Sequence, residues 1–396
     1  MDNLQLSTVN SQLKKGWVIK TLNEISDNWD SKRIPITQNV RSKGDIPYYG
    51  ASGIVDYVSD YLFDDDLLCI SEDGANLLAR TYPIAFSISG KTWVNNHAHV
   101  LKFGNIISQK FVELYLNSIK LNDFVSGMAQ PKLNQTMLNK IPIPFPLLPE
   151  QQHIVAILDE AFAAIAKAKA NAQQNLKNAK ELFESYLQGV FENGNWEEKR
   201  LDEITDVKDG THDSPKYIKE GIPFVTQKNI KLIGLNFDDT KFINEIDHEK
   251  FYKRSNVNFG DILISMIGAN RGMAALVDDK RIFSIKNVGL IKSSNNVNKH
   301  FLLYYLKSPL AMKYVLYMSN GGAQEFVGLT ALRSFPIPYP PLKTQQTIVQ
   351  KLDALSAETK KLENIYQQKI NDLEELKKSI LQKAFSGELK TIKELV

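Results

Sequence analysis

One segment of this sequence is written twice, and the repeat constrains the architecture more than any other feature. Gly127–Asp159 recurs as Gly321–Asp353, with 16 of 33 aligned positions identical. The openings of the two copies also match, because Trp17 aligns with Trp196. A repeat of this length indicates that each copy is one structural unit. We therefore expect two similar modules in the chain.

The repeat predicts the order module, long helix, module, long helix. Within each module, short β-like runs alternate with short amphipathic helices, which is typical of an α+β fold. The predicted boundaries are 1–148 for the first module, 149–192 for the first helix, 193–342 for the second module, 343–386 for the second helix and 387–396 for a tail.

Each module is followed by a long helical pattern. No proline or glycine interrupts Glu150–Gln188, and apolar residues recur there at steps of three and four. A helix of about 40 residues is roughly 60 Å long, and its apolar stripe needs a partner of similar length. The first helix is rich in alanine and the second in leucine and isoleucine, so the two suit each other. Pairing of each helix with another chain is the alternative.

Composition excludes several classes of protein. Apolar residues make up 43% of the chain and charged residues 23%, which is typical of a globular protein. Cys69 is the single cysteine, so no internal disulfide forms. The sequence shows neither a signal peptide nor a membrane span, which favours the cytoplasm and no membrane partner. The net charge of +3 is modest for a protein that grips nucleic acid alone.

The sequence lacks the common catalytic motifs. It contains no G-x-G-x-x-G, no G-x-x-x-x-G-K-[ST] and no [ND]-P-P-[YF] tetrapeptide. His97 and His99 stand two apart and share a strand face, but a zinc site needs further ligands nearby. We therefore predict no catalytic residue, no metal site and no cofactor in this chain.

Polar loops fill the first half of each module, and the two modules differ most there. Basic, amide and aromatic side chains on such loops donate to base edges and phosphates. We predict DNA contacts at Arg33, Arg41, Lys43, Tyr49, Lys91 and His97 in the first module, and at His212, Lys216, Gln227, Lys228, Asn229 and Arg271 in the second. For any single residue, a solvated loop position is the competing interpretation.

Two variable modules that each end in G-x-A-Q, a proline-rich P-I-P-x-P segment and Q-x-x-I-V-x-x-L-D resemble the specificity (S) subunit of type I restriction-modification systems. The resemblance covers nearly the whole chain. It rests on Gly127–Gln130 with Pro142–Asp159, on Gly321–Gln324 with Pro336–Asp353, and on the DGTH and GIPF segments of the second module. The first module departs from the usual opening, with DNWDSKRIP where the second has DGTH.

The resemblance implies that each module is a target recognition domain that reads one half of a bipartite site in double-stranded DNA. The two helices would pack as an antiparallel coiled coil with pseudo-twofold symmetry and set the spacing of the half-sites. They would also dock two modification (methyltransferase) subunits, which bring S-adenosylmethionine, and restriction (motor-nuclease) subunits would join. We assign Gln151, Gln152, Gln345 and Gln346 to helix packing or methyltransferase docking.

Two other functions remain open from the residues alone. A duplicated coiled-coil scaffold without DNA binding would show the same repeat and the same helices. A self-contained nuclease or methyltransferase with a degenerate motif would bind S-adenosylmethionine or cleave DNA by itself. Copurification of a methyltransferase from the native cell distinguishes the specificity subunit from both.

Overall fold

The computed structural model describes residues 13–127, 129–319 and 326–389. By its contacts the chain divides into two units. Unit 1 holds the described residues up to Ala172 together with those from Gln368 onward, and unit 2 is Gln173–Gln367. The second copy of the G-x-A-Q motif, Gly321–Gln324, lies outside the described residues, as do residues 390–396 of the predicted tail. Each unit therefore contains one module and part of both long helices.

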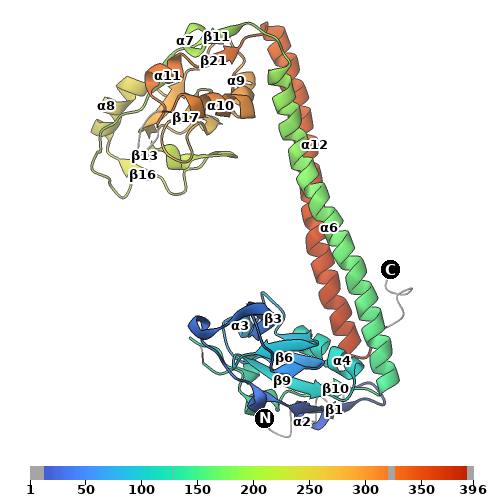
Figure 1. The fold of residues 1–396 in the computed structure, drawn as a ribbon. Helices are drawn as coiled ribbons and strands as arrows, with labels where there is room; N and C mark the ends of the chain where they lie inside the picture. Colours follow the sequence, from blue (N-terminus) through green and yellow to red (C-terminus); the bar gives the residue numbers. More distant parts are fainter. Residues whose placement is uncertain (1–12, 128, 320–325, 390–396) are drawn as a thin grey trace. The chain divides into compact units, whose positions relative to one another are not determined.

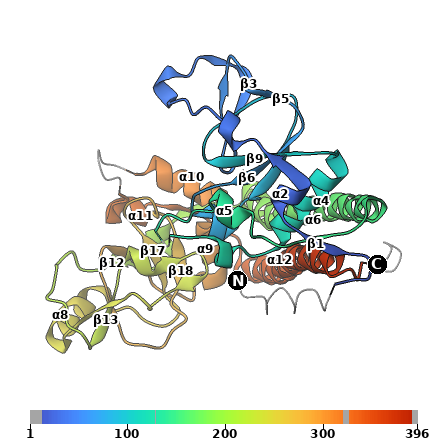
Figure 2. The ribbon, with the colours of Figure 1, turned by 90° about the horizontal axis from the view of Figure 1, so that it is seen from below.

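The two long helices are α6, Leu148–Glu192, and α12, Leu342–Phe385. In unit 1 the beginning of α6 packs against the end of α12, where Lys169 pairs with Glu374 at 2.6 Å. In unit 2 the end of α6 packs against the beginning of α12. The helices therefore run antiparallel, side by side (Figures 1 and 2). The predicted antiparallel coiled coil within one chain is confirmed.

Unit 1 contains two small sheets. A four-stranded sheet has the order β2-β9-β6-β7, and a second has the order β4-β3-β8-β5. The first is built from Ser26–Asn28, Ala98–Phe103, Leu67–Ser71 and Ala85–Ile88, and the second from Gly53–Val58, Lys43–Gly50, Lys91–Val94 and Phe63–Asp64. Every residue of β6 is buried, Cys69 included. Helix α4, Ile106–Ser118, contacts the first sheet at β7, β9 and β6.

Unit 2 repeats this topology. Its four-stranded sheet has the order β12-β20-β17-β18, and a three-stranded sheet has the order β16-β13-β19. The strands are Val207–Asp209, Val288–Ile291, Ile262–Ser265 and Ala274–Leu276, then Lys241–Ile243, Ile222–Val225 and Ser284–Ile285. In the second sheet of each unit, one strand pairs antiparallel on one side and parallel on the other (β3 in unit 1, β13 in unit 2), and unit 1 adds the antiparallel strand β5. The predicted α+β repeat is thus confirmed.

Short helices complete each unit and give it a mixed architecture. Unit 1 adds α2, α3 and α5 to α4, and unit 2 adds α7, α8, α9, α10 and α11. Their bounds are Leu22–Ile25, Asn76–Ala79 and Gln135–Leu138, then Leu201–Ile204, Glu245–Ser255, Lys299–Leu306, Pro309–Tyr317 and Leu329–Arg333. Helix α8 begins with Asn244 as its N-cap, whose side chain accepts from the Asp247 backbone. Such caps satisfy the first backbone donors of a helix.

An aromatic cluster ties the end of each long helix to a module. Phe385, at the end of α12, packs edge-on against Phe111 and Tyr115 of unit 1. Phe191, near the end of α6, packs in the same way against Phe301 and Tyr305 of unit 2. Each long helix therefore begins beside one module and ends in the core of the other copy's unit.

The proline-rich segments are extended, as the sequence predicts. Ile143–Phe145 (β10) pairs with Val18–Lys20 (β1), and Pro336–Pro338 (β21) pairs with Glu198–Arg200 (β11). These two-stranded pairs hold the start of each long helix close to the opening of its own module. Within the described residues, no helix combines the length and the apolar composition that crossing a membrane requires.

Candidate nucleic-acid interface

A buried carboxylate occupies the same repeat position in each unit. Asp30 and Asp209 each lie thirteen residues after the tryptophan that opens their repeat. Asp30 follows β2 and Asp209 ends β12, so both stand at the end of the first strand of the four-stranded sheet. Each pairs with one arginine and one histidine. These two partners hold the carboxylate, and with it the loop that follows the strand, which is the loop predicted to face DNA.

In unit 1 the side chain of Arg33 takes part in this network through several hydrogen bonds and ion pairs. The Nη2 of Arg33 lies 3.5 Å from Asp30 Oδ2, and Nη1 donates to Glu72 Oε2 at 2.8 Å and to the Ala98 carbonyl at 2.6 Å. The Asp30 carboxylate also lies 2.6 Å from Nδ1 of His99. The Arg33 side chain is only 12% exposed. It therefore supports the loop from inside, and the structure does not favour it as a direct DNA contact.

Three of these groups, Asp30, Glu72 and His99, place a ligand atom each within 4.8 Å of one another. The Arg33 guanidinium lies against both carboxylates and supplies the positive charge that they need. The Nε2 of His99 is 2.8 Å from the Leu133 carbonyl, so both ring nitrogens have hydrogen-bond partners. The geometry is that of a salt-bridge network around a buried histidine.

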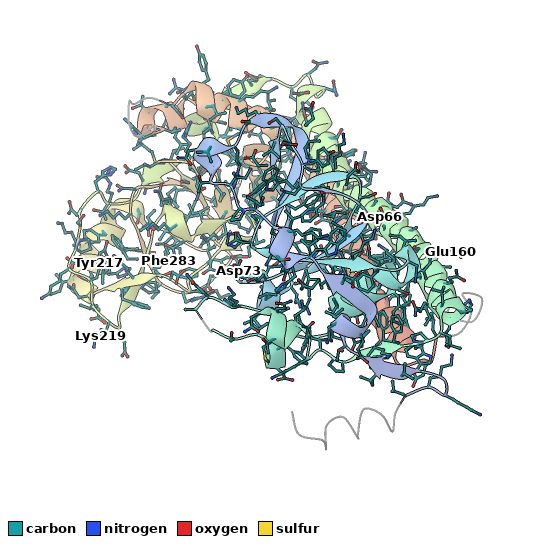
Figure 3. All side chains as sticks on the ribbon, turned by 60° about the horizontal axis from the view of Figure 1, so that its bottom comes forward. Asp66, Asp73, Glu160, Tyr217, Lys219 and Phe283 are labelled. Atoms are coloured by element: carbon teal, nitrogen blue, oxygen red, sulfur yellow. The ribbon has the colours of Figure 1, made fainter. Side chains whose placement is uncertain are left out.

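The other predicted contacts of unit 1 lie on its surface and its second sheet. His97 is half exposed and its Nδ1 lies 2.7 Å from Asp73 Oδ2, which Figure 3 labels. Lys91 and Lys43 are exposed at the starts of β8 and β3. Lys91 stands 4.7 Å from the centre of the Tyr61 ring.

Two predicted residues of the same sheet are partly buried. Arg41 donates to Asp56 Oδ2 at 3.0 Å and lies over the Tyr48 ring. Tyr49 stacks on Phe86, and burial raises the pKa of its hydroxyl. The side chains of Arg41 and Tyr49 are therefore engaged within unit 1, whereas those of Lys43 and Lys91 are exposed.

Unit 2 contains a cleft of about 760 Å³ that collects polar and basic side chains. Four lysines and two aspartates line it, together with amides and two aromatic rings. The lining residues are Tyr217, Phe224, Thr226, Gln227, Lys228, Asn229, Lys231, Asn236, Asp238, Asp239, Lys241, Ile267, Asn270, Lys286 and Asn287. Tyr217, labelled in Figure 3, carries the Lys241 ammonium 4.3 Å above its ring. The excess of cations suits an anionic polymer.

The cleft brings together three residues that the sequence singled out, Gln227, Lys228 and Asn229. They form the single turn η4 after β13. Lys228 is exposed. Asn229 is buried, donates to the Asn236 carbonyl at 3.0 Å and to Thr240 Oγ1, and accepts from the Thr226 backbone. Asn229 therefore shapes the cleft wall, and a direct base contact by it is not favoured.

Gln227 differs from its neighbour in what its amide contacts. Within the described part of the chain, its Oε1 is buried without a hydrogen-bond partner. A buried acceptor without a donor is costly, and such atoms concentrate at functional sites. Gln227 is thus the residue of the cleft whose chemistry most needs a further partner.

The remaining predicted residues of unit 2 lie around the cleft. His212 places Nδ1 2.7 Å from Oδ1 of Asn287, a lining residue, and Nε2 3.1 Å from Asp209. Lys216 is exposed next to Tyr217. Arg271 donates to Ser319 Oγ at 2.9 Å and to the Gly268 carbonyl. His212 therefore contacts Asp209 in unit 2, as Arg33 contacts Asp30 in unit 1.

Sequence reasoning missed the buried carboxylates and three of the four cleft lysines. Asp209 accepts hydrogen bonds from Nε and Nη2 of Arg254 and is 5% exposed. Asp30 and Asp209 lie at the same distance in sequence from the tryptophan of their repeat, and this shared position could have identified them. Lys231, Lys241 and Lys286 lie far apart in sequence and meet only through the sheet.

Gln151 and Gln345 fasten each long helix to its module. Gln151 donates through Nε2 to the Pro146 carbonyl at 2.7 Å, and its Oε1 accepts from the Ser108 hydroxyl of α4 at 2.7 Å. Gln345 is the counterpart in unit 2: it donates to the Pro340 carbonyl and accepts from the Asn298 backbone N–H, both at 2.8 Å.

These glutamines are 1% and 0% exposed, so they offer no surface to a docking subunit. Of the two roles assigned to these glutamines, helix packing or methyltransferase docking, the structure shows packing for Gln151 and Gln345. Gln152 and Gln346, one residue further along the helix, are exposed. Docking by these two remains a prediction.

Gln151→Leu is expected to lower the free energy of unfolding by about 2 kcal/mol, because it leaves the Pro146 carbonyl and the Ser108 hydroxyl buried without partners. Gln345→Leu is expected to do the same in unit 2. Chemical denaturation measures both losses. The matched controls, Gln152→Leu and Gln346→Leu, change exposed neighbours and are expected to stay within about 0.5 kcal/mol. Equal losses in the controls would contradict the internal role.

Comparison with known proteins gives a match over most of the chain. The family model described as type I restriction modification DNA specificity domain matches twice, over residues 14–177 and 193–375. The two matches coincide with the two copies of the repeat.

Individual relatives and solved structures agree with this match. A Haemophilus influenzae protein named as a type I restriction enzyme specificity subunit is 29% identical over 84% of this chain and 86% of its own length. The MjaIX specificity subunit of Methanocaldococcus jannaschii is 24% identical over 93% of this chain and 95% of its own. A structure describing complex assembly of the type I R-M system aligns with a TM-score of 0.72 at 19% identity, covering 95% of this chain and 99% of that one. The HsdS subunit of Thermoanaerobacter tengcongensis aligns with a TM-score of 0.63 at 18% identity, covering 95% and 98%.

Proposed function

Because this chain belongs to the type I restriction-modification DNA specificity family, we propose that it selects the DNA target of a type I restriction-modification complex. The observation that carries the proposal is the repeat. The chain contains two copies of one recognition fold, and each copy is joined to both helices of the antiparallel pair. Each copy takes one half of a bipartite site. Two copies with different loops accordingly give two different half-sites.

The helix pair suits the role of a spacer. Helices of 45 and 44 residues that pack along each other are far stiffer than a flexible linker. Each end of the pair is fastened to a module by the aromatic cluster and by the buried glutamine. A spacer fixed at both ends sets the number of base pairs between the half-sites, as half-site spacing follows protein geometry in other repeated DNA readers.

The cleft of unit 2 has the chemistry for reading a half-site. Lysines such as Lys228 and Lys241 neutralise phosphates and position the duplex. Gln227 lines the cleft, and the amide of a glutamine is suited to pair with the adenine edge in the major groove. In unit 1 the exposed Lys43, Lys91 and His97 take the corresponding place.

Catalysis belongs to the partners under this proposal. Methyltransferase subunits bring S-adenosylmethionine and methylate adenine, and restriction subunits add cleavage. The exposed Gln152 and Gln346 stand at the start of each helix, where a methyltransferase subunit would dock on each side. The modest net charge of +3 fits a chain that shares its hold on DNA with partners.

Mapping adenine methylation across the native genome, with and without this gene, tests the proposal. We expect one bipartite motif, two short half-sites around a fixed spacer, to lose its methylation when the gene is deleted. Methylation of this motif is expected to return when the gene is supplied again. Unchanged methylation, together with no DNA retention by the copurified complex, would favour the duplicated scaffold instead.

A further inference from the structure

Unit 2 has a two-stranded hairpin at the rim of the cleft that the described part of unit 1 lacks. Its strands are β14, Ile230–Lys231, and β15, Gly234–Leu235, joined by a two-residue turn. The hairpin stands between β13 and β16 in the chain. In unit 1 the corresponding strands, β3 and β4, are joined by Ala51 and Ser52 alone. The hairpin is therefore specific to the second module.

The turn of this hairpin has an unusual composition. Turn positions are usually filled by Asn, Asp, Ser, Gly or Pro, and in this hairpin Gly234 supplies the positive φ of +132°. Here the turn is Leu232-Ile233, and the two side chains are 77% and 90% exposed. Large aliphatic side chains at a turn do not stabilise the hairpin, and their exposure to water is unfavourable. Folding of the hairpin does not explain this pair.

The support beneath the turn is firm. Ile230 is buried, and Leu235 packs against the core of unit 2. Across the base of the hairpin, the Asn236 backbone donates to the Asn229 carbonyl at 2.8 Å, and the Asn229 side chain donates to the Asn236 carbonyl at 3.0 Å. The apolar pair is thus held out on a rigid arm.

The surroundings of the turn carry the charge that a DNA contact needs. Lys231 belongs to the hairpin and lines the cleft, as does Lys228 just before it. Apolar side chains flanked by cations are the means by which many proteins insert between base steps and kink a duplex. The apolar pair alone would suit a protein partner as well as DNA. The cleft behind it, with its four lysines, favours DNA.

We propose that Leu232 and Ile233 form an apolar wedge that inserts into the half-site read by unit 2 and unstacks one base step. The proposal rests on the proposed function, since it requires that unit 2 binds duplex DNA. It makes the two half-sites unequal: one is read with local distortion and the other is read by a module without this hairpin. The distorted half-site then favours an easily unstacked pyrimidine–purine step at the wedge position.

The test uses the complex purified from the native cell and duplexes that carry its methylated target. In each duplex one adenine of the half-site is replaced by 2-aminopurine, whose fluorescence rises on unstacking. The methylated adenine and its two neighbours are left unchanged, because a methyltransferase flips its target base out of the stack. The variant is Leu232→Ser with Ile233→Asn, which places two common turn residues at these positions and keeps Gly234, whose φ is +132°. The matched control is Ile246→Asn, which removes an aliphatic side chain that is 82% exposed on α8 and does not line the cleft.

We expect a fluorescence increase at one step of the half-site read by unit 2. The turn variant is expected to abolish this increase and to weaken target binding by about tenfold or more, the order of magnitude for one buried aliphatic side chain. The Ile246 control is expected to behave like the wild type.

Three results would overturn the wedge. One is target binding by the wild type without unstacking in this half-site, and another is full unstacking by the turn variant. In both, the target is still recognised, so the proposed function survives. The third is loss of the methyltransferase subunits from the turn variant, which would make the hairpin a protein contact. Absence of any sequence-dependent binding by the wild type would instead refute the proposed function and the wedge together.

Discussion

A chain in which residues 205–340 are replaced by the matching segment of a relative is expected to recognise a target with one half-site changed and the other intact. The replaced segment contains the four-stranded and the three-stranded sheet of unit 2, the β14–β15 hairpin and the whole cleft. Unit 1 keeps its own core, which shares no residue with that segment. Each mismatched base pair costs about 1–3 kcal/mol, so the original half-site is expected to lose at least about a thousandfold in preference.

Methylation mapping of cells that carry the exchanged gene measures this outcome. The exchange has to retain the contacts of Phe301 and Tyr305 with Phe191, because these aromatic side chains join the module to α6. The reciprocal exchange of the first module serves as the control and is expected to change the other half-site. A change in both half-sites from one exchange would show that the modules do not read independently.

Removal of the carboxylate in unit 1, by Asp30→Ala, is expected to lower the free energy of unfolding of that unit by about 3–5 kcal/mol. The substitution leaves Arg33 and His99 buried without the partner that balances them, and breaking a buried ion pair has a cost of this order. It also removes the acceptor of the Val100 backbone N–H. Chemical denaturation, followed by tryptophan fluorescence, measures the loss.

Asp27→Ala is the matched control, because Asp27 lies in β2 and is exposed. It is expected to change the free energy of unfolding by no more than about 0.5 kcal/mol. An equally mild effect of Asp30→Ala would show that Arg33 and His99 find other partners, and that the carboxylate does not hold the loop.

The pH dependence of unfolding gives a second readout of the same carboxylate. Burial alone would raise the pKa of Asp30, but hydrogen bonds from His99 and Val100, with the charges of His99 and Arg33, lower it below its usual value of 3.8. A carboxyl whose pKa is lower in the folded state stabilises the fold above its unfolded pKa. This contribution is lost as the pH falls below about 4 and through the folded pKa. The Asp30→Ala variant is expected to lack that part of the acid dependence.

The sequence alone was enough to predict the two modules, the α+β class and the two long helices, because a repeat and an uninterrupted heptad pattern are local properties of the chain. It was less reliable about which face of each helix is buried. Steps of three and four lead from Phe183 to Tyr186 and Val190 in the sequence, whereas in the structure Tyr186 is 41% exposed and its neighbour Leu187 is buried. The module packed against the end of α6 selects the buried face, and that contact is not encoded in the helix period.

The candidate site divides in the same way. Residue type and loop position identified Gln227 and Lys228, which do line one cleft, but they did not separate these from Asn229 or Arg33, whose hydrogen bonds turn inward.

What the sequence by itself determined about this protein is its duplicated plan and the positions that recur in it, such as Asp30 with Asp209 and Gln151 with Gln345. What only the tertiary structure decided is what each recurring position does. The same buried carboxylate draws its arginine from its own loop in unit 1 and from α8 in unit 2. Burial and charge pairing depend on which distant segments meet, and those meetings arise only when the chain is folded.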